Sequence, residues 1–227
     1  MKLYHYTTLD ALKSILHSDS FNLSSFCNSN DYKEKKWKVF NDGRTVDDYK
    51  YFSTCARQTP DGKSFMGFAN GMLWYFYAQN HSGVCIELDS NKLDRLEKMH
   101  SGFVNYKDGV CHVDEQDAID YLMEKRTCWN GENEYRYVFS ADSLDISNFS
   151  QYVTAIYFGA NMDWNSKEPI ENYIKIKEKM LEHGSSNCNY YRMWFDANDG
   201  RTNRIDFELA LNIEKAVKST YRVEKLG

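Results

Sequence analysis

The segment Val153–Phe158 constrains the fold more than any other stretch of this sequence. It reads Val-Thr-Ala-Ile-Tyr-Phe, is dominated by β-branched and aromatic residues, and is closed by Gly159. A strongly β-forming apolar run of this length is typical of a strand that is buried on both faces. The sequence therefore predicts a central strand at residues 153–158.

Other strands and short helices alternate irregularly around this run. Lys2–Thr7 alternates like a strand, and Thr8 is a suitable N-cap for a helix with apolar residues at helical spacing up to Leu16. Further strands are expected at Lys50–Ala56, Val84–Asp89 and Tyr190–Phe195, further helices at Met72–Gln79, Lys92–His100 and Ile170–His183, and only weak alternation is present at Asp206–Ala216. This irregular order predicts an α+β fold with a mixed, split β-sheet.

Length and charge exclude several classes of protein. The chain has 227 residues, which is enough for one domain with a sizeable core. Its net charge of −5 creates no overall field that would gather nucleic acid or an anionic membrane. No apolar run is long enough for a signal peptide or a membrane span, so we expect a cytoplasmic protein without a membrane partner.

Familiar cofactor and metal patterns do not occur in the sequence. The six cysteines are widely spread, form no Cys-x-x-Cys pair, and have no histidine at ligand spacing. We expect reduced, mostly buried thiols and no metal site. Neither a Gly-x-Gly-x-x-Gly nor a Walker pattern is present, which argues against a Rossmann or P-loop nucleotide site.

The stretch Glu132–Phe139 is the strongest candidate for a functional site. In a strand, Glu132, Glu134 and Arg136 share one face, while the other face is aromatic. Strand interiors are usually depleted in glutamate, so two carboxylates beside an arginine favour a site for a cationic or hydroxyl-rich ligand. The alternative is an edge strand whose solvated face pairs with itself.

Two other places in the chain each allow a functional and a structural interpretation. His5 lies just before the N-terminus of the first helix, a natural place to meet a phosphate or a ribose, or it bonds only to backbone. Trp74 and Tyr77 lie three residues apart on one side of the helix expected at 72–79. Such aromatic stripes more often belong to the core than to a ligand platform.

Five blocks occur in an order that resembles a known family. They are Tyr4-His-Tyr-Thr7 before a helix, Tyr51-Phe-Ser53, Met72-Leu-Trp-Tyr-Phe-Tyr-Ala78 followed by His81-Ser-Gly83, Lys125-x-x-x-Trp129-x-x-Glu132-x-Glu134-Tyr-Arg136, and Ala155-Ile-Tyr-Phe-Gly159. This order resembles a bacterial domain-of-unknown-function family with the patterns Met-Trp-x-x-Tyr-Ala-x-x-His-x-Gly and Trp-x-x-Glu-x-Glu-Tyr-Arg. The likeness covers residues 1–160. Leu73 departs from it and leaves open whether Tyr75 or Tyr77 occupies the motif position.

The same succession of histidine, tyrosine and glutamate is similar to the ADP-ribosyltransferase superfamily, in the His-Tyr-Glu class that includes DNA-modifying toxins and poly-ADP-ribose polymerases. The resemblance implies a split mixed β-sheet with NAD bound in its cleft and no metal. It also implies one ADP-ribosyltransferase-like domain over residues 1–227, in which residues 161–227 complete the motif-bearing core of residues 1–160. The implied reaction transfers ADP-ribose from NAD and releases nicotinamide.

The resemblance also implies roles for individual residues. Glu134 accepts a hydrogen bond from the ribose and stabilises the positive charge that builds as the nicotinamide bond breaks. Glu132 activates the acceptor as a general base. Tyr77, or alternatively Tyr75, stacks on nicotinamide, and His5 bonds to a ribose hydroxyl.

Four further residues complete the predicted NAD site. Thr7 and Ser53 hold the amide or ribose, and Trp74 belongs to the same cofactor-binding group. Arg136 pairs with the pyrophosphate, although a structural Arg–Glu pair explains it equally well.

The predicted biological role is that of a toxin or antiphage effector with an antitoxin protein as partner. We expect RNA or DNA as the acceptor in preference to protein, with a local track of basic residues beside Trp37, namely Lys33, Lys35, Lys36, Lys38 and Arg44. A solvated helix is the alternative interpretation of that segment. The competing functions are a catalytically silent nucleotide-binding or interaction module and a nuclease that depends on histidine and glutamate.

Overall fold

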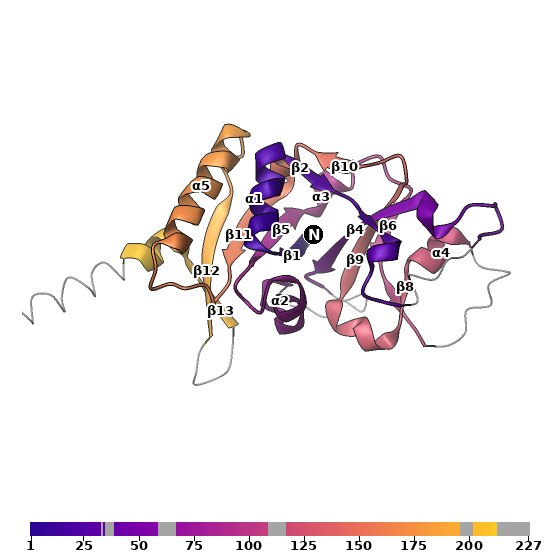
Figure 1. Cartoon of the computed structure of the whole chain (residues 1–227), viewed down its shortest axis with the longest axis horizontal. Coiled ribbons are helices and arrows are strands. Elements are labelled where there is room, and N and C mark those ends of the chain that lie inside the picture. Colours follow the sequence, from indigo (N-terminus) through magenta and orange to yellow (C-terminus); the bar gives the residue numbers. More distant parts are fainter. Residues whose placement is uncertain (33, 35–38, 59–66, 109–116, 196–201, 213–227) are drawn as a thin grey trace, which may run out of the picture.

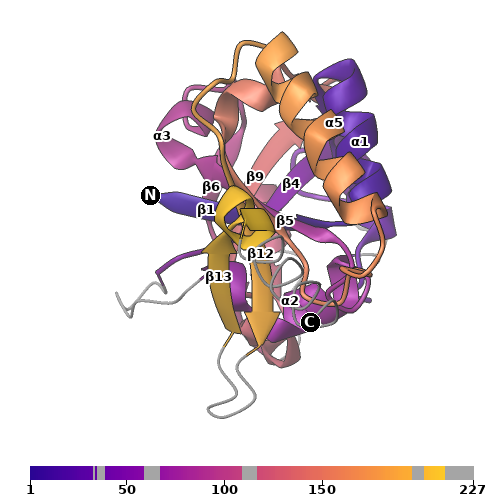
Figure 2. The same ribbon diagram turned by 90° about the vertical axis from the view of Figure 1, so that its left-hand side faces the viewer.

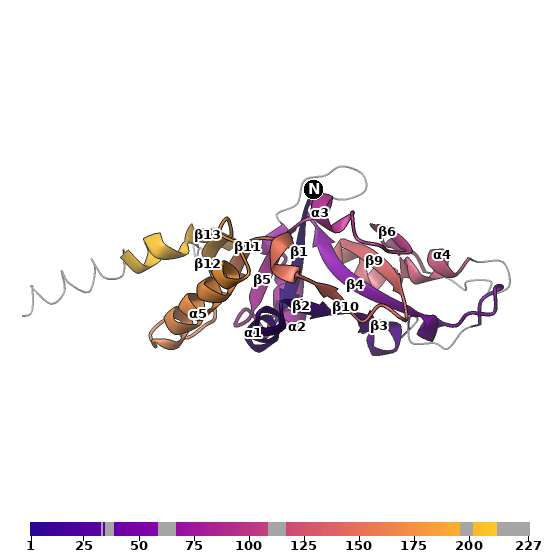
Figure 3. The same ribbon diagram turned by 90° about the horizontal axis from the view of Figure 1, so that it is seen from above.

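The structure is a computed structural model that describes residues 1–32, 34, 39–58, 67–108, 117–195 and 202–212. One large mixed sheet organises these residues. Its strands lie in the order β13 (Thr202–Asp206), β12 (Asn189–Phe195), β11 (Val153–Phe158), β5 (Val84–Asp89), β1 (Lys2–Thr7), β4 (Tyr49–Ala56), β9 (Glu134–Ser140) and β6 (His100–Phe103), with β3 (Ser24–Ser25) paired to β4. Within this sheet β11 and β12 are parallel and the other pairs are antiparallel. Figure 3 shows the sheet extending from β13 to β6.

Helices cover both faces of the sheet. They are α1 (Leu9–Ser18), α2 (Gly71–Tyr77), α3 (Ser90–Leu93), α4 (Ala118–Leu122) and α5 (Glu168–Glu182). Leu12 and Ile15 of α1 belong to the main core, whereas Leu73 and Trp74 of α2 belong to a second apolar cluster. The two helices accordingly lie on opposite sides of β1 and β5 (Figure 1). α5 lies beside α1 (Figure 2).

Two short ladders complete the architecture. β2 (Ser20–Asn22) pairs with β10 (Asp145–Ser147), and β7 (Asn105–Tyr106) pairs with β8 (Glu124–Lys125). A 3₁₀ helix, η4 (Thr127–Glu132), connects β8 to β9. None of the described helices combines the length and the apolar character that crossing a bilayer requires.

The predicted central strand is confirmed. β11 has neighbours on both edges, and its last four residues are buried. It ends at Gly159, where an added Cβ would lie 2.0 Å from the carbonyl oxygen of His81, so only glycine fits. The N-cap at Thr8 is also confirmed, because its side chain accepts a hydrogen bond from the Ala11 amide at 3.0 Å.

Two of the predicted elements are wrong. The helix expected at Lys92–His100 stops after Leu93, and His100 already begins β6, which pairs with β9. Residues 207–212 are helical where the sequence shows weak strand-like alternation, and Phe207 packs into the main core. In both segments tertiary packing outweighs the local pattern.

The sheet is irregular between β1 and β4, and this irregularity positions the candidate site. All six residues of β1 pair with β5, but only Leu3 and Tyr4 pair with β4, opposite Ala56 and Cys55. A continued ladder would bring His5 opposite Thr54, yet the backbones have separated by that point. The sheet thus opens toward the C-terminal end of β1.

Candidate functional site

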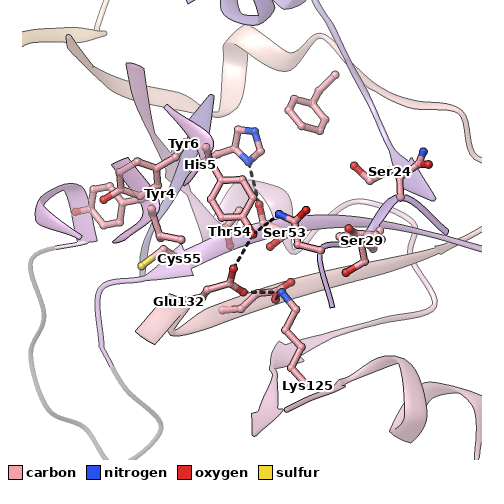
Figure 4. Close-up of a pocket in the computed structure, with 17 residues that line it drawn as sticks. Tyr4, His5, Tyr6, Ser24, Ser29, Ser53, Thr54, Cys55, Lys125 and Glu132 are labelled. Atoms are coloured by element: carbon pink, nitrogen blue, oxygen red, sulfur yellow. Dashed lines mark hydrogen bonds and ion pairs between the residues drawn. The ribbon is translucent and has the colours of Figure 1, made fainter. Parts of the chain in front are cut away.

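A pocket of about 230 Å³ lies where β1 and β4 separate. Both strands contribute to its wall, and the rest comes from the segment after β2, from α2 and from the region that leads into β9. The lining residues are Tyr4, His5, Tyr6, Phe21, Ser24, Asn28, Ser29, Asn30, Tyr51, Ser53, Thr54, Cys55, Leu73, Tyr77, Lys125, Glu132 and Glu134. Figure 4 shows His5 with Ser53 on one side and Glu132 with Lys125 on the other.

His5 bridges the gap between the two strands. Its Nδ1 lies 2.9 Å from the carbonyl oxygen of Ser53, so this nitrogen carries the proton and donates. Burial lowers the pKa of His5 to about 4, even though the Ser53 carbonyl favours the protonated ring. The ring is therefore neutral at pH 7, and its Nε2 is an acceptor that a ligand hydroxyl can use. The backbone bond expected as an alternative for His5 is present, and the ring lines the pocket as well.

Three aromatic side chains of helix α2 lie in three different environments. Tyr77 lines the pocket, and its hydroxyl donates to Glu132 Oε1 at 2.7 Å. Tyr75 is 60% exposed and lies outside the pocket lining. Trp74 is fully buried, donates from Nε1 to the Phe68 carbonyl at 2.7 Å, and also lies outside the lining. Of the three predicted aromatic contacts, the structure brings only Tyr77 to the site.

The expectation that Glu132 and Glu134 share one strand face is wrong. Glu132 ends η4, Asn133 adopts a left-handed conformation with φ 44°, and the strand begins only at Glu134. The two carboxylates nevertheless meet because Lys125 Nζ lies 2.5 Å from Glu132 Oε2 and 2.9 Å from Glu134 Oε2. A buried ammonium group thus joins them.

Arg136 is a structural partner of Glu134 and lies outside the pocket lining. Its Nε and Nη2 donate to the two oxygens of Glu134 at 2.7 and 3.0 Å, and Nη2 also lies 2.6 Å from Glu34 Oε1. The side chain is fully buried. Since β9 pairs with both β4 and β6, the alternative of a solvated edge strand is wrong, and Arg136 is not placed to meet a pyrophosphate in this pocket.

Burial and the surrounding charges shift the pKa values of the two carboxyl groups in opposite directions. Burial alone would raise the pKa of Glu134, but Arg136 and Lys125 outweigh it and hold the pKa well below its usual range. Burial, together with the negative charge of Glu134, raises the pKa of Glu132 despite its contact with Lys125. Glu134 is therefore the ionised member of the pair at neutral pH, and Glu132 is the more basic one.

Several residues of the site have no role that the sequence alone assigns. Lys125 belongs to one of the motif blocks, but its spacing of seven residues from Glu132 gives no sign that the two side chains meet. Glu34 lies in a lysine-rich segment, and Ser29 and Asn30 lie in a polar stretch. Asn30 Nδ2 donates to the Tyr77 hydroxyl at 3.2 Å, and the Ser29 hydroxyl bonds to Glu34. These contacts tie the segment after β2 to the charged cluster.

Two other predicted regions do not join the pocket. Thr7 ends β1 and is not among the lining residues. In the predicted basic track, Lys33, Lys35, Lys36, Trp37 and Lys38 lie outside the described residues, and Arg44 pairs with Asp42 at 2.5 Å.

The described side chains offer no group of three or more histidine, cysteine, aspartate or glutamate residues that could hold a metal ion. Comparison with protein-family models, curated proteins and solved structures finds no match to this chain.

Proposed function

We propose that the protein is an NAD-dependent ADP-ribosyltransferase whose site is the pocket between β1 and β4. One observation carries the proposal: Glu132 and Glu134 are linked by Lys125 in a pocket that opens at a break in the sheet and faces His5 and Tyr77. The break supports the split-sheet architecture that the resemblance to ADP-ribosyltransferases implies. Fold-level likeness alone would not identify an activity, so the arrangement of these side chains is decisive.

The reaction breaks the bond between the nicotinamide nitrogen and C1′ of the ribose. The electron pair leaves with nicotinamide, and C1′ gains oxocarbenium character. An acceptor oxygen or nitrogen then bonds to C1′ and loses its proton to a base. Ionised Glu134 stabilises the developing positive charge, and the more basic Glu132 takes the proton. The divergence of the two pKa values fits this division of roles.

His5 and Tyr77 supply orientation. The Nε2 acceptor of neutral His5 suits a ribose hydroxyl, and the ring of Tyr77 suits the flat face of nicotinamide. The cavity of about 230 Å³ is smaller than the roughly 300–1,000 Å³ typical of a pocket for a whole drug-sized ligand. It therefore takes the nicotinamide ribose end of NAD, with the remainder extending over the surface.

A catalytically silent nucleotide-binding module is the second candidate. It is favoured by the saturation of Glu134, whose two oxygens already accept from Arg136 and Lys125 in a fully buried position. A carboxylate held in this way stabilises a nearby cation electrostatically but has little room to accept from a ribose hydroxyl. The two candidates differ in one property, which is turnover of NAD.

The acceptor and the biological role extend the proposal. Transfer to RNA or DNA in preference to protein, action as a toxin or antiphage effector and neutralisation by an antitoxin protein rest on the resemblance. We also propose a cytoplasmic site of action. The pocket geometry supports the donor half of the reaction, and the acceptor has to be sought separately.

Release of nicotinamide tests the proposal. We expect the purified wild type to release nicotinamide from NAD in the presence of cell extract, and Glu134→Gln to lose activity by about 10²- to 10³-fold. Glu132→Gln should retain more nicotinamide release than Glu134→Gln but should transfer little ADP-ribose to an acceptor. Exposed Glu97→Gln is the matched control for removal of one carboxylate charge.

Thermal unfolding of each variant separates lost chemistry from lost folding. If the folded wild type releases no nicotinamide with any extract, the transferase function is rejected in favour of the catalytically silent binding module. Equal activity of wild type and folded Glu134→Gln would remove Glu134 from the mechanism.

A further inference from the structure

A second groove lies beside the candidate site and has a different chemistry. It has a volume of about 590 Å³ and is lined by residues of β1, β5, β11, β12 and β13, together with Arg57 and Phe68. A neighbouring hollow of about 640 Å³ shares Lys2 and Arg57 with it. Tyr4 lines both this groove and the candidate site, so the two are adjacent across a single side chain.

Three stacked aromatic rings line the groove. Tyr157 is fully buried and stacks on both Phe68 and Tyr191, with ring centroids 4.9 and 5.0 Å apart and interplanar angles of 5° and 23°. Arg204 extends its guanidinium group over this stack, 4.4 Å from the centre of the Tyr191 ring and 4.9 Å from that of Phe68. The Tyr157 hydroxyl accepts from Arg204 Nη1 at 2.5 Å, which fixes the orientation of the guanidinium plane.

The charge in the groove is positive although the chain as a whole is negative. Lys2, Arg57 and Arg204 face one carboxylate among the lining residues, Glu87. Glu87 is already satisfied, because Lys2 lies 2.9 Å from Oε1 and the Tyr157 hydroxyl donates to Oε2 at 2.7 Å. Among the described residues, neither Arg57 nor Arg204 forms an ion pair with a carboxylate. Both arginines are exposed, so N–H groups of each side chain can reach an anionic ligand.

We propose that this groove binds single-stranded nucleic acid, with phosphates at Arg57 and Arg204 and a base stacked at the platform of Arg204, Tyr191 and Phe68. Guanidinium and aromatic faces are the surfaces on which unpaired bases stack, and every base offers such a face. Arginine also binds phosphate through paired N–H donors. The role of the bound strand as the acceptor rests on the proposed function, whereas binding itself does not.

The groove gives the proposed transferase a place to hold its acceptor. A strand that lies along it reaches Tyr4, whose other side belongs to the NAD pocket. The net charge of −5 is compatible with this arrangement because phosphate contacts depend on the local field, and the groove itself carries the positive charge.

Fluorescence anisotropy with labelled oligonucleotides, RNA and DNA strands of about twelve nucleotides, tests the proposal in the absence of NAD. We expect the wild type to bind single strands more tightly than the corresponding duplex. Tyr191→Leu should weaken binding by about fivefold to a hundredfold, the range for loss of one stacked base. The double variant Arg57→Gln/Arg204→Gln should make the plot of log K against log salt concentration shallower. The magnitude of its negative slope should fall by about 1.4, which corresponds to the loss of two phosphate contacts on a single strand. Arg95→Gln, an exposed arginine outside the groove, is the matched control and should leave binding unchanged.

The possible outcomes distinguish nucleic-acid binding in the groove from binding elsewhere on the protein and from NAD turnover in the pocket. Unchanged binding in both groove variants, with the variants folded, overturns the proposal, as does absence of binding by the wild type. Loss of binding in Arg44→Gln but not in the groove variants would move the contact to the lysine-rich segment. Binding of ATP as tightly as the oligonucleotide would replace the strand by a mononucleotide. Nicotinamide release without oligonucleotide binding would support the proposed transferase and reject only the proposal that the groove binds nucleic acid.

Discussion

The two sides of β1 differ in how completely they are built. On one side, β5 pairs with all six residues of β1. The other edge of β5 pairs with β11, whose last four residues are buried. On the other side, β4 pairs with two residues and then separates. The open side adjoins a buried ion cluster formed by Lys125, Arg136, Glu34, Glu132 and Glu134. On the continuous side, Glu87 of β5 pairs with Lys2 of β1, and β11 contributes apolar residues to the main core. A closed sheet contributes stability, and a sheet that opens creates room for polar chemistry.

Removal of Arg136 should have the largest effect on stability. Arg136→Met leaves Glu134 and Glu34 buried with one cation fewer, and breaking a buried ion cluster in this way costs about 3–5 kcal/mol of the free energy of unfolding. Urea denaturation measures the change. Lys177→Met, which breaks the exposed pair with Glu208, is the control and should cost less than about 1 kcal/mol. Similar losses in the two variants would show that the cluster is not electrostatically special.

A cavity in the continuous side should come next. Ile156 is fully buried and lies between Ile86 of β5 and Tyr190 of β12, so Ile156→Ala should cost about 2–5 kcal/mol. The activity per folded molecule should be unchanged, because this strand does not line the pocket. Half-exposed Ile174→Ala on α5 is the matched control. If Ile156→Ala abolished NAD turnover in protein that stays folded, the separation between the two sides would be refuted.

The open side should also make stability depend on pH. The native pKa of His5 is about 4 and its ordinary value is 6.5, so between these values the unfolded chain binds more protons. The His5 contribution, up to about 3 kcal/mol, is present above pH 6.5 and is lost as the pH falls toward 4. Urea titrations at about pH 7 and about pH 5 measure it. His5→Gln should flatten this part of the profile, and an unaltered profile would show that the ring is not desolvated.

The smallest effect should come from a single hydroxyl group. Tyr77→Phe removes the donor to Glu132 Oε1 while keeping the ring, at a cost of about 0.5–1.5 kcal/mol. Tyr75→Phe, on the exposed side of the same helix, should change the free energy of unfolding by less than about 0.5 kcal/mol. Equal effects would mean that the bond between Tyr77 and Glu132 does not stabilise the native state.

The local sequence pattern was sufficient to predict much of the fold. The run Val153–Phe158 and the N-cap at Thr8 are both where periodicity and capping chemistry place them, because each depends on residues close in the chain. The failed helix at Lys92–His100 is different: its last residue pairs with Val138, a distant partner in the sequence that no local pattern reveals.

The candidate site was predictable in its residue types but not in its arrangement. Glu132, Glu134, His5, Ser53 and Tyr77 do meet in one pocket. Alternation could not show that Asn133 turns left-handed and takes Glu132 off the strand. Helical spacing could not separate Trp74 from Tyr77 by role, since burial of Trp74 depends on strands β1 and β5 packing against α2.

Binding of a non-cleavable NAD analogue tests whether NAD occupies the pocket between β1 and β4. Isothermal titration calorimetry would compare the wild type with Tyr77→Leu and with Tyr75→Leu, two changes of the same kind on one helix. We predict that Tyr77→Leu weakens binding by about tenfold or more, because the stacking ring is lost, and that Tyr75→Leu stays within about twofold of the wild type. No binding by the wild type, or equal binding by all three proteins, would contradict the placement of NAD between β1 and β4.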